Sequence, residues 1–232
     1  NLLTEGEKTL LRSLTVFSGG WTLEAAESVC SQDGSEFDIL DLLTQLVDKS
    51  LVNLKDSRYR ILETTRQYAR EKLLDSGEAL AMHDKHLNYF LDLANHADKE
   101  IHGTHQVEWL DRLETEHDNN HAALDWCVSS GYTESALRLI GSFSGIGRLW
   151  SVRGYFSEAR NWFDKVRTTP DIACYPNEFA LALNGVAFIT LLQSDYSSAF
   201  SMAEESRCLC QPLGSEGEMA LSGALTVNGL AK

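Results

Sequence analysis

The stretch from Leu51 to Arg70 constrains the fold more than any other part of this sequence. One short extended run contains Leu51, Val52 and Leu54, and a second contains Tyr59, Ile61 and Leu62, with the polar triplet Lys55-Asp56-Ser57 between them. Such runs around a polar turn are typical of a β-hairpin. The following residues, Glu63 to Leu74, space their apolar side chains at helical intervals. We therefore predict a small hairpin, or wing, that leads directly into a helix.

Three helices are predicted ahead of the wing. Thr4 and Glu7 form a capping-box pattern at the start of the first helix, and Ser18-Gly19-Gly20 ends it. The second helix runs from Leu23 to Cys30. The third leads into the wing and turns Phe37, Leu40, Leu43, Leu46 and Val47 inward. With the closing helix, these elements predict a winged-helix domain over residues 1–77.

The distribution of charge in this domain argues against binding to nucleic acid. The whole chain carries a formal net charge of -14. In DNA-binding winged helices the helix before the wing enters the major groove. Here that helix carries Glu36, Asp38, Asp41 and Asp48 against Lys49. Because carboxylates repel phosphates, we expect no direct nucleic-acid binding by this chain and a packing role for the domain.

Residues 78–232 show a continuous helical pattern with a recurring turn. The turn appears as the segments 131–136, 154–159 and 194–199, each with an alanine five residues after its first small residue. An alanine at that place fits where two antiparallel helices cross closely. The last two alanines lie 199 − 159 = 40 residues apart and the first two 159 − 136 = 23. We predict a mainly α fold: an irregular tetratricopeptide-like superhelical array, cut off within a repeat at its C-terminal end.

The concave groove of such an array is the place where we expect a ligand. First helices of successive hairpins supply polar and aromatic side chains to that groove. The candidates are Arg148, Trp150, Arg153, Asn184 and Gln193. A peptide, a protein or a small inducer would suit these groups.

Little in the sequence suggests catalysis or metal binding. His117 and His121 lie one helical turn apart with Glu114 nearby, but the acid between them is Asp118, and we predict no metal site. Neither a Gly-rich phosphate loop nor a G-x-S-x-G nucleophile context is present, so we expect no enzymatic activity. Five scattered cysteines and the lack of a long apolar run predict a cytoplasmic protein with reduced thiols and no membrane contact.

Four segments together give the chain a family resemblance. They are FSGGWTLEAA at 17–26, RYRILETTRQYA at 58–69, WLDRLETEHDN at 109–119 and RGYFSEAR at 153–160. In these segments the chain resembles bacterial signal-transduction ATPases with numerous domains, the NB-ARC-like STAND class, and more narrowly their predicted-ATPase transcriptional regulators. The resemblance implies a nucleotide-binding domain before the winged helix, repeats after it, and an effector domain elsewhere in a longer polypeptide.

The resemblance also implies a switch. Nucleotide exchange and ligand binding to the repeats would together shift an off state to an on state, with the winged helix packed on the nucleotide-binding domain. ATP or ADP with Mg²⁺ is expected only in that missing domain. Alignment on the wing makes Leu62, Glu63 and Arg66 the candidate contacts to it, and we interpret Met82-His83-Asp84 as a chance match to a related motif. The alternative is a free-standing tetratricopeptide-like scaffold for protein–protein interaction.

Overall fold

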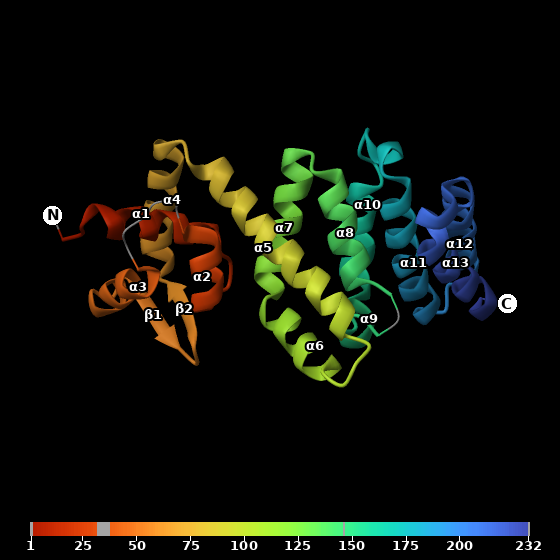
Figure 1. The fold of residues 1–232 in the computed structure, drawn as a ribbon, viewed down its shortest axis with the longest axis horizontal. Helices are drawn as coiled ribbons and strands as arrows, with labels where there is room; N and C mark the ends of the chain where they lie inside the picture. Colours follow the sequence, from red (N-terminus) through yellow and green to blue (C-terminus); the bar gives the residue numbers. More distant parts are fainter. Residues whose placement is uncertain (1, 32–37, 146, 232) are drawn as a thin grey trace. The chain divides into compact units, whose positions relative to one another are not determined.

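The computed structural model describes residues 2–31, 38–145 and 147–231 (Figure 1). By packing, the chain divides into two compact units. The first comprises Asn1–Phe90 with Glu116–Ala123, and the second Leu91–Thr115 with Leu124–Lys232. The predicted domain boundary after Gly77 stays a prediction. Gly77 itself ends a helix in the left-handed conformation.

The first unit contains the predicted helices and the wing. Its helices are α1 (Glu5–Ser13), the 3-10 turn η1 (Leu14–Val16), α2 (Leu23–Cys30), α3 (Ile39–Asp48) and α4 (Glu63–Ser76), with the beginnings of α5 (Ala79–Glu100) and α7 (His117–Ser130). The predicted capping box is confirmed: the Thr4 N–H donates to Glu7 Oε2 at 2.7 Å, and the Glu7 N–H donates to Thr4 Oγ1 at 3.3 Å. The second helix has the predicted bounds.

The wing is an antiparallel hairpin of β1 (Val52–Lys55) and β2 (Arg58–Ile61). Val52 pairs with Ile61 and Leu54 with Tyr59. Asp56 and Ser57 form the two-residue turn with φ of 51° and 61°, and positive φ at both positions is the geometry that matches the twist of a hairpin. Trp21 extends the pairing, because its N–H donates to the Tyr59 carbonyl at 3.0 Å and its carbonyl accepts from the Tyr59 N–H at 2.8 Å. The predicted wing is therefore confirmed.

The third helix differs in part from its prediction. Leu43 and Leu46 are fully buried as expected, but Leu40 is 43% exposed and Leu42 takes the inward position. The reason is the helix start: Asp38 caps α3 through the Leu40 N–H, which places Leu40 in the solvent-facing first turn. Glu36 and Phe37 lie outside the described residues.

The second unit is built of helices joined by short turns. It begins with the second part of α5, the whole of α6 (Gln106–Thr115) and the second part of α7. The following elements are α8 (Thr133–Phe143), α9 (Leu149–Arg153), α10 (Phe156–Val166), η2 (Ile172–Cys174), α11 (Pro176–Leu192), α12 (Tyr196–Cys210), η3 (Gln211–Gly217) and α13 (Glu218–Leu230). Helix α11 packs against α8, α12 and α13 (Figure 1). It is apolar around its whole circumference, as a central helix must be.

The recurring turn of the sequence is a recurring backbone motif. Gly131, Gly154 and Ser194 have φ of 75°, 79° and 64°. After each of them, the next N–H donates to the carbonyl five residues earlier, at 2.9, 3.0 and 3.2 Å. This pattern is that of a Schellman helix end. The three alanines that follow, Ala136, Ala159 and Ala199, are at most 1% exposed, so the expected close packing at these positions is present.

Among the described residues, no helix combines the length and the apolar character needed to cross a membrane.

Candidate nucleic-acid interface

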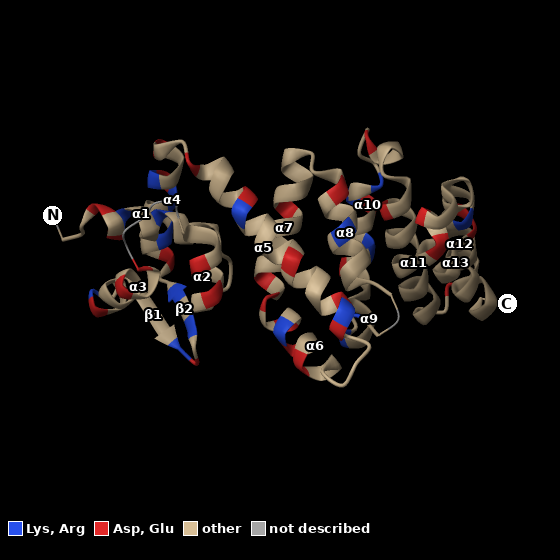
Figure 2. Ribbon diagram, in the orientation of Figure 1, with Lys and Arg blue, Asp and Glu red and all other residues tan. Residues whose placement is uncertain are grey.

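The basic residues of the first unit are concentrated on the wing and on α4. Between Lys49 and Lys72 the sequence has seven Lys or Arg and three Asp or Glu, a local charge of 7 − 3 = +4 in a chain of net charge -14. In Figure 2 the ribbon is blue at the Lys and Arg positions of the hairpin and of α4. Lys55 and Arg60 are exposed on the wing. Sequence reasoning missed this segment because it counted charge over the chain and over the third helix alone.

One cation of the wing has a structural role. The Arg58 guanidinium donates to Glu116 Oε2 at 3.1 Å and to the Gly20 carbonyl at 3.0 Å. Asn119 joins the same network, since its Nδ2 donates to Glu116 Oε2 at 2.7 Å and to the Gly20 carbonyl at 2.8 Å. Its Oδ1 accepts from the Ser18 N–H at 2.7 Å. Arg58 therefore faces inward, while Lys55 and Arg60 remain available to a partner.

The exposed face of α3 is mixed in character. Asp41 and Asp48 are exposed carboxylates, and Thr44 and Gln45 lie between them as neutral polar groups. Lys49, at the end of the helix, forms an ion pair with the fully buried Glu7. That hydrogen bond from Lys49, with the one from the Thr4 N–H, lowers the pKa of the Glu7 carboxyl. The cations that can meet phosphate are thus on the wing and α4 rather than on α3.

The candidate residues at the start of α4 adjoin a small cavity. Glu63 and Arg66 line a cavity of about 180 Å³ together with Trp21, Arg60 and the Gly19-Gly20 turn. Leu62 caps the helix without a side-chain hydrogen bond and is 48% exposed, outside the cavity lining. Two of the three predicted residues therefore line one cavity, and their neighbours there are the cation Arg60 and apolar side chains such as Trp21 and Ile61.

A scan against known families matches most of the helices and the wing of this unit. Residues 3–74 match the model described as a winged helix-turn-helix domain. Residues 3–74 are a winged helix-turn-helix domain. The predicted wing, the helices before it and the short Trp21 pairing are the parts of that domain.

Some relatives of the chain are named as HTH-type regulators. A protein of Mycobacterium tuberculosis named "Putative HTH-type transcriptional regulator" is 42% identical over 170 residues, and a protein of the same name from Mycobacterium bovis matches equally. The match covers 71% of this chain and 19% of each relative. An uncharacterized protein of Mycobacterium tuberculosis is 42% identical over 95 residues, covering 37% of this chain and 24% of that protein. No solved structure matches the chain.

The expectation that this chain makes no direct contact with nucleic acid is therefore wrong. A winged helix-turn-helix domain, in a chain homologous to proteins named transcriptional regulators, points to DNA binding. The expectation failed for a physical reason: phosphate contacts depend on local cations, and the average over an acidic chain hides the basic wing. A charge count over residues 49–72 would have revealed it.

The five groove candidates of the second unit lie in different surroundings. Arg148 and Asn184 line one cavity of about 230 Å³. Trp150 does not line a groove, since it is 1% exposed and packs edge-on against Phe143. Arg153 is paired with Asp111 and, at 2.8 Å, with Glu114. Gln193 ends α11 and accepts a hydrogen bond from Arg160 at 3.2 Å.

The polar groups that line the cavity of Arg148 and Asn184 are only partly hydrogen-bonded within the protein. Arg148 pairs with Asp98 at 2.5 Å and donates to the Ser144 carbonyl at 3.2 Å. Asn184 is 7% exposed, and its Nδ2 donates to the Ala220 carbonyl at 2.6 Å. Its Oδ1 has no donor among the residues that the structure describes. A ligand that donates a hydrogen bond would complement this acceptor.

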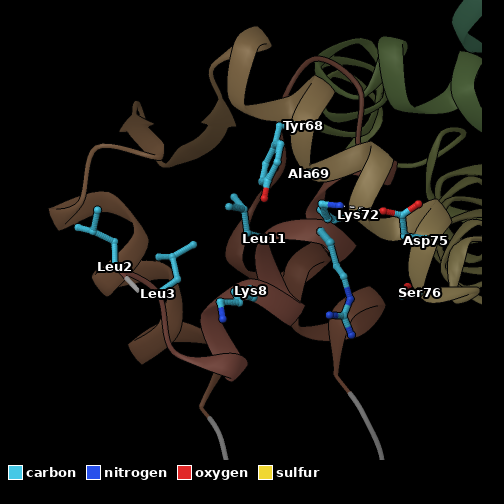
Figure 3. A pocket seen from close by; sticks show the side chains of 10 residues that line it. Leu2, Leu3, Lys8, Leu11, Tyr68, Ala69, Lys72, Asp75 and Ser76 are labelled. Atoms are coloured by element: carbon cyan, nitrogen blue, oxygen red, sulfur yellow. Dashed lines mark hydrogen bonds and ion pairs between the residues drawn. The ribbon is translucent and has the colours of Figure 1, made fainter.

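Another cavity of the first unit has mainly apolar walls. It measures about 530 Å³ and lies between α1, α4 and the segment before α1, with Leu3, Leu11 and Tyr68 among its lining (Figure 3). Its cations are already paired: Lys8 with Glu5, Arg12 with Glu78 and Lys72 with Asp75. The cavity therefore offers apolar surface without an obvious charged group for a ligand.

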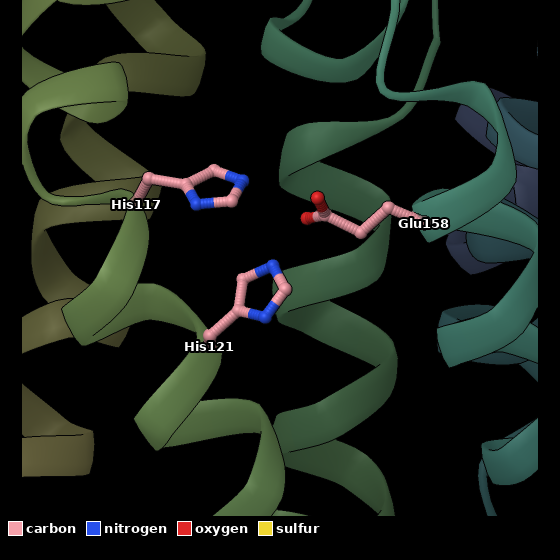
Figure 4. Close-up of side chains that lie close together, drawn as sticks. All are labelled: His117, His121 and Glu158. Atoms are coloured by element: carbon pink, nitrogen blue, oxygen red, sulfur yellow. The ribbon is translucent and has the colours of Figure 1, made fainter.

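Two histidines lie close together on α7, and three other titratable side chains are buried. His117 and His121 lie on α7 with ring centroids 4.4 Å apart (Figure 4), and the absence of a metal site there stays an expectation. Burial lowers the pKa of His86 to about 3, with its Nε2 3.4 Å from Asn119 Oδ1. Burial raises the pKa of Cys30 and of Cys127 to about 12. These three groups are neutral at physiological pH.

Proposed function

We propose that this chain is the DNA-contacting part of a cytoplasmic transcriptional regulator and that its wing supplies the contacts to the DNA backbone. The observation that carries the proposal is the winged helix-turn-helix match over residues 3–74 together with the exposed Lys55 and Arg60 on the hairpin. Phosphate contacts dominate the affinity of proteins for DNA, and the wing offers them where α3 offers carboxylates. Thr44 and Gln45 on α3 remain candidates for contacts to bases.

DNA binding by a pair of matched variants tests this proposal. Lys55→Gln/Arg60→Gln removes two charges from the wing, whereas Lys99→Gln/Arg138→Gln removes two charges from the second unit. We expect the wing variant to bind a labelled duplex about tenfold more weakly at 0.1 M salt, by fluorescence anisotropy, and the control to stay within about twofold. Equal losses in the two variants would contradict a wing contact.

The second part of the proposal concerns regulation. We propose that the second unit is a tetratricopeptide-like sensor and that it relays ligand binding to a nucleotide-binding domain outside this chain, without a catalytic step of its own. The match covers only 19% of the relatives, which leaves room for such a domain in them. The resemblance to STAND ATPases supports the order of domains, and the Arg148 and Asn184 cavity is the candidate ligand site.

The regulatory part is tested separately in the full-length protein. We expect Asn184→Leu to weaken the response to an inducer found by thermal-shift screening and to leave DNA binding by the isolated chain unchanged. Gln193→Leu, outside the cavity, is the matched control. An unchanged response in Asn184→Leu would contradict this cavity as the ligand site, whereas the lack of any inducer response in the natural protein would argue for the alternative, a scaffold that assembles partners without switching.

A further inference from the structure

We infer that the cavity lined by Trp21, Arg60 and Arg66 is an oxyanion site that holds one phosphate of bound DNA. This inference rests on the proposed function and identifies the group that the first unit recognises. The cavity has a volume of about 180 Å³. It adjoins the wing through Arg60 and Ile61, so a duplex on the wing can present a phosphodiester to it.

Two guanidinium groups supply positive charge to the cavity. Arg60 is exposed and lies across Gly20, where a Cβ would meet Arg60 Cγ at 2.9 Å. Arg66 pairs with Glu63 at 3.8 Å, and the Glu63 side chain is 84% exposed. A long, exposed ion pair of this kind is weak. A phosphate can therefore replace the Glu63 carboxylate on Arg66, because guanidinium forms paired hydrogen bonds with phosphate oxygens.

The N-terminus of α4 adds a third source of positive potential. The helix has 14 residues, and Leu62 at its N-cap provides no side-chain acceptor. The first N–H groups of a helix lack partners within it and carry the positive end of the helix dipole. Anions bind at such ends. Glu63, the first residue of the helix, lines the cavity, which places this end of α4 beside the two arginines.

A buried donor gives independent support for an anionic occupant. Trp21 lines the cavity and is 2% exposed, and its Nε1–H has no acceptor among the described residues. A buried N–H without an acceptor is unfavourable. The ring is held in place by stacking on Phe17 at 5.4 Å and on Tyr59 at 6.4 Å. An indole can only donate, and the oxygens of a phosphate diester only accept.

The backbone carbonyls beside the cavity already accept hydrogen bonds, which leaves them less available to a cation. The Gly20 carbonyl accepts from Arg58 and Asn119, and the Tyr59 carbonyl accepts from the Trp21 N–H. Two carboxylates lie nearby: Glu63, and Asp118, whose Oδ2 would be 2.2 Å from a Cβ on Gly19. They reduce the affinity for a free dianion more than for a phosphodiester with one charge. DNA is therefore the preferred source of the phosphate.

The Trp21 indole N–H signal in ¹⁵N NMR spectra of the full chain tests the inference, with Trp21→Phe used to assign it. We expect duplex DNA to shift this signal at a concentration about tenfold lower than inorganic phosphate or ADP does. Arg66→Gln should weaken the effect of inorganic phosphate about tenfold, whereas Arg70→Gln on the same helix should change it less than about twofold. Circular dichroism confirms that each variant is folded.

The outcomes separate this site from the proposed function. If anisotropy shows duplex binding but the Trp21 signal does not shift, the cavity is not the phosphate site, and the proposal of DNA binding stands. A shift with inorganic phosphate in the absence of duplex binding overturns the DNA source and contradicts the proposed function. Saturation by ADP at lower concentration than by duplex assigns the site to a free nucleotide and overturns the inference as stated.

Discussion

At the scale of single residues, Glu7 connects a local pattern to the packing of the first unit. Its side chain closes the capping box with Thr4 and pairs with Lys49, which follows α3. The pairing lowers its pKa from the ordinary value of 4.5. A carboxyl with a lowered folded-state pKa stabilises the fold above its unfolded-state pKa, and this contribution is lost as the pH falls through the folded-state value.

We expect Glu7→Gln to lower the melting temperature at pH 7 by about 3–6 °C, because Lys49 loses its charged partner. The difference from the natural chain should shrink as the pH falls from 4.5 through the lower folded-state pKa of Glu7, because the unfolded chain and then the folded chain become protonated at this carboxyl. Thermal unfolding followed by circular dichroism at several pH values measures both effects. Glu5→Gln, an exposed pair with Lys8, is the control and should change little. A pH-independent difference would contradict the charge argument.

Gly20 permits the close approach of the first loop to the wing. Its φ is +103°, and a Cβ would lie 2.7 Å from the Tyr59 carbonyl oxygen. Gly77 has a φ of +74° with nothing within 4 Å. We expect Gly77→Ala to cost about 1 kcal/mol from backbone strain alone, and Gly20→Ala to cost at least about 2 kcal/mol more. Urea unfolding measures both, and equal costs would show that the loop can move away from the wing.

At the scale of elements, the three Schellman turns allow the free-energy cost of a positive φ to be compared between glycine and serine. Gly131 and Gly154 adopt positive φ without steric strain, whereas Ser194 adopts a φ of 64° with a side chain. We expect Ser194→Gly to stabilise the second unit by about 0.5–1 kcal/mol, measured by urea unfolding. Gly131→Ser should destabilise the second unit by a similar amount. A Cβ there has no atom within 4 Å, so the only cost is that of a positive φ in a residue with a side chain. Destabilisation by Ser194→Gly would mean that the serine side chain has a role of its own.

The elements were predictable from sequence where local rules determine them. Thr4 with Glu7, the turn at Asp56 and Ser57, and the recurring alanines each depend on neighbours a few residues away. The placement of Trp150 was not predictable, because its burial depends on contact with Phe143 across a loop. The role of Arg58 was not predictable either, because its partner Glu116 is 58 residues away in the sequence. Periodicity identifies elements, but it does not identify which distant charges meet.

At the scale of the whole molecule, the acidic chain and its basic wing should give DNA binding an unusual salt dependence. At 0.1 M salt the Debye length is about 10 Å, so the net charge of -14 is screened and local cations dominate. If Lys55 neutralises one phosphate and Arg60 with Arg66 a second, log K should fall against log salt with a slope of about −2. Near 0.01 M the Debye length is about 30 Å, and repulsion from the rest of the chain should flatten the plot.

Anisotropy titrations from 0.01 to 0.3 M salt measure this dependence. Removing one wing cation, as in Lys55→Gln, should reduce the slope above 0.1 M by about 1. Lys99→Gln/Arg138→Gln makes the net charge more negative by two and leaves the wing intact. That variant should keep the slope above 0.1 M and bind more weakly only at low salt, because its added repulsion acts at long range. A straight plot with one slope for all three proteins would mean that the net charge of the molecule, rather than the wing, governs its encounter with DNA.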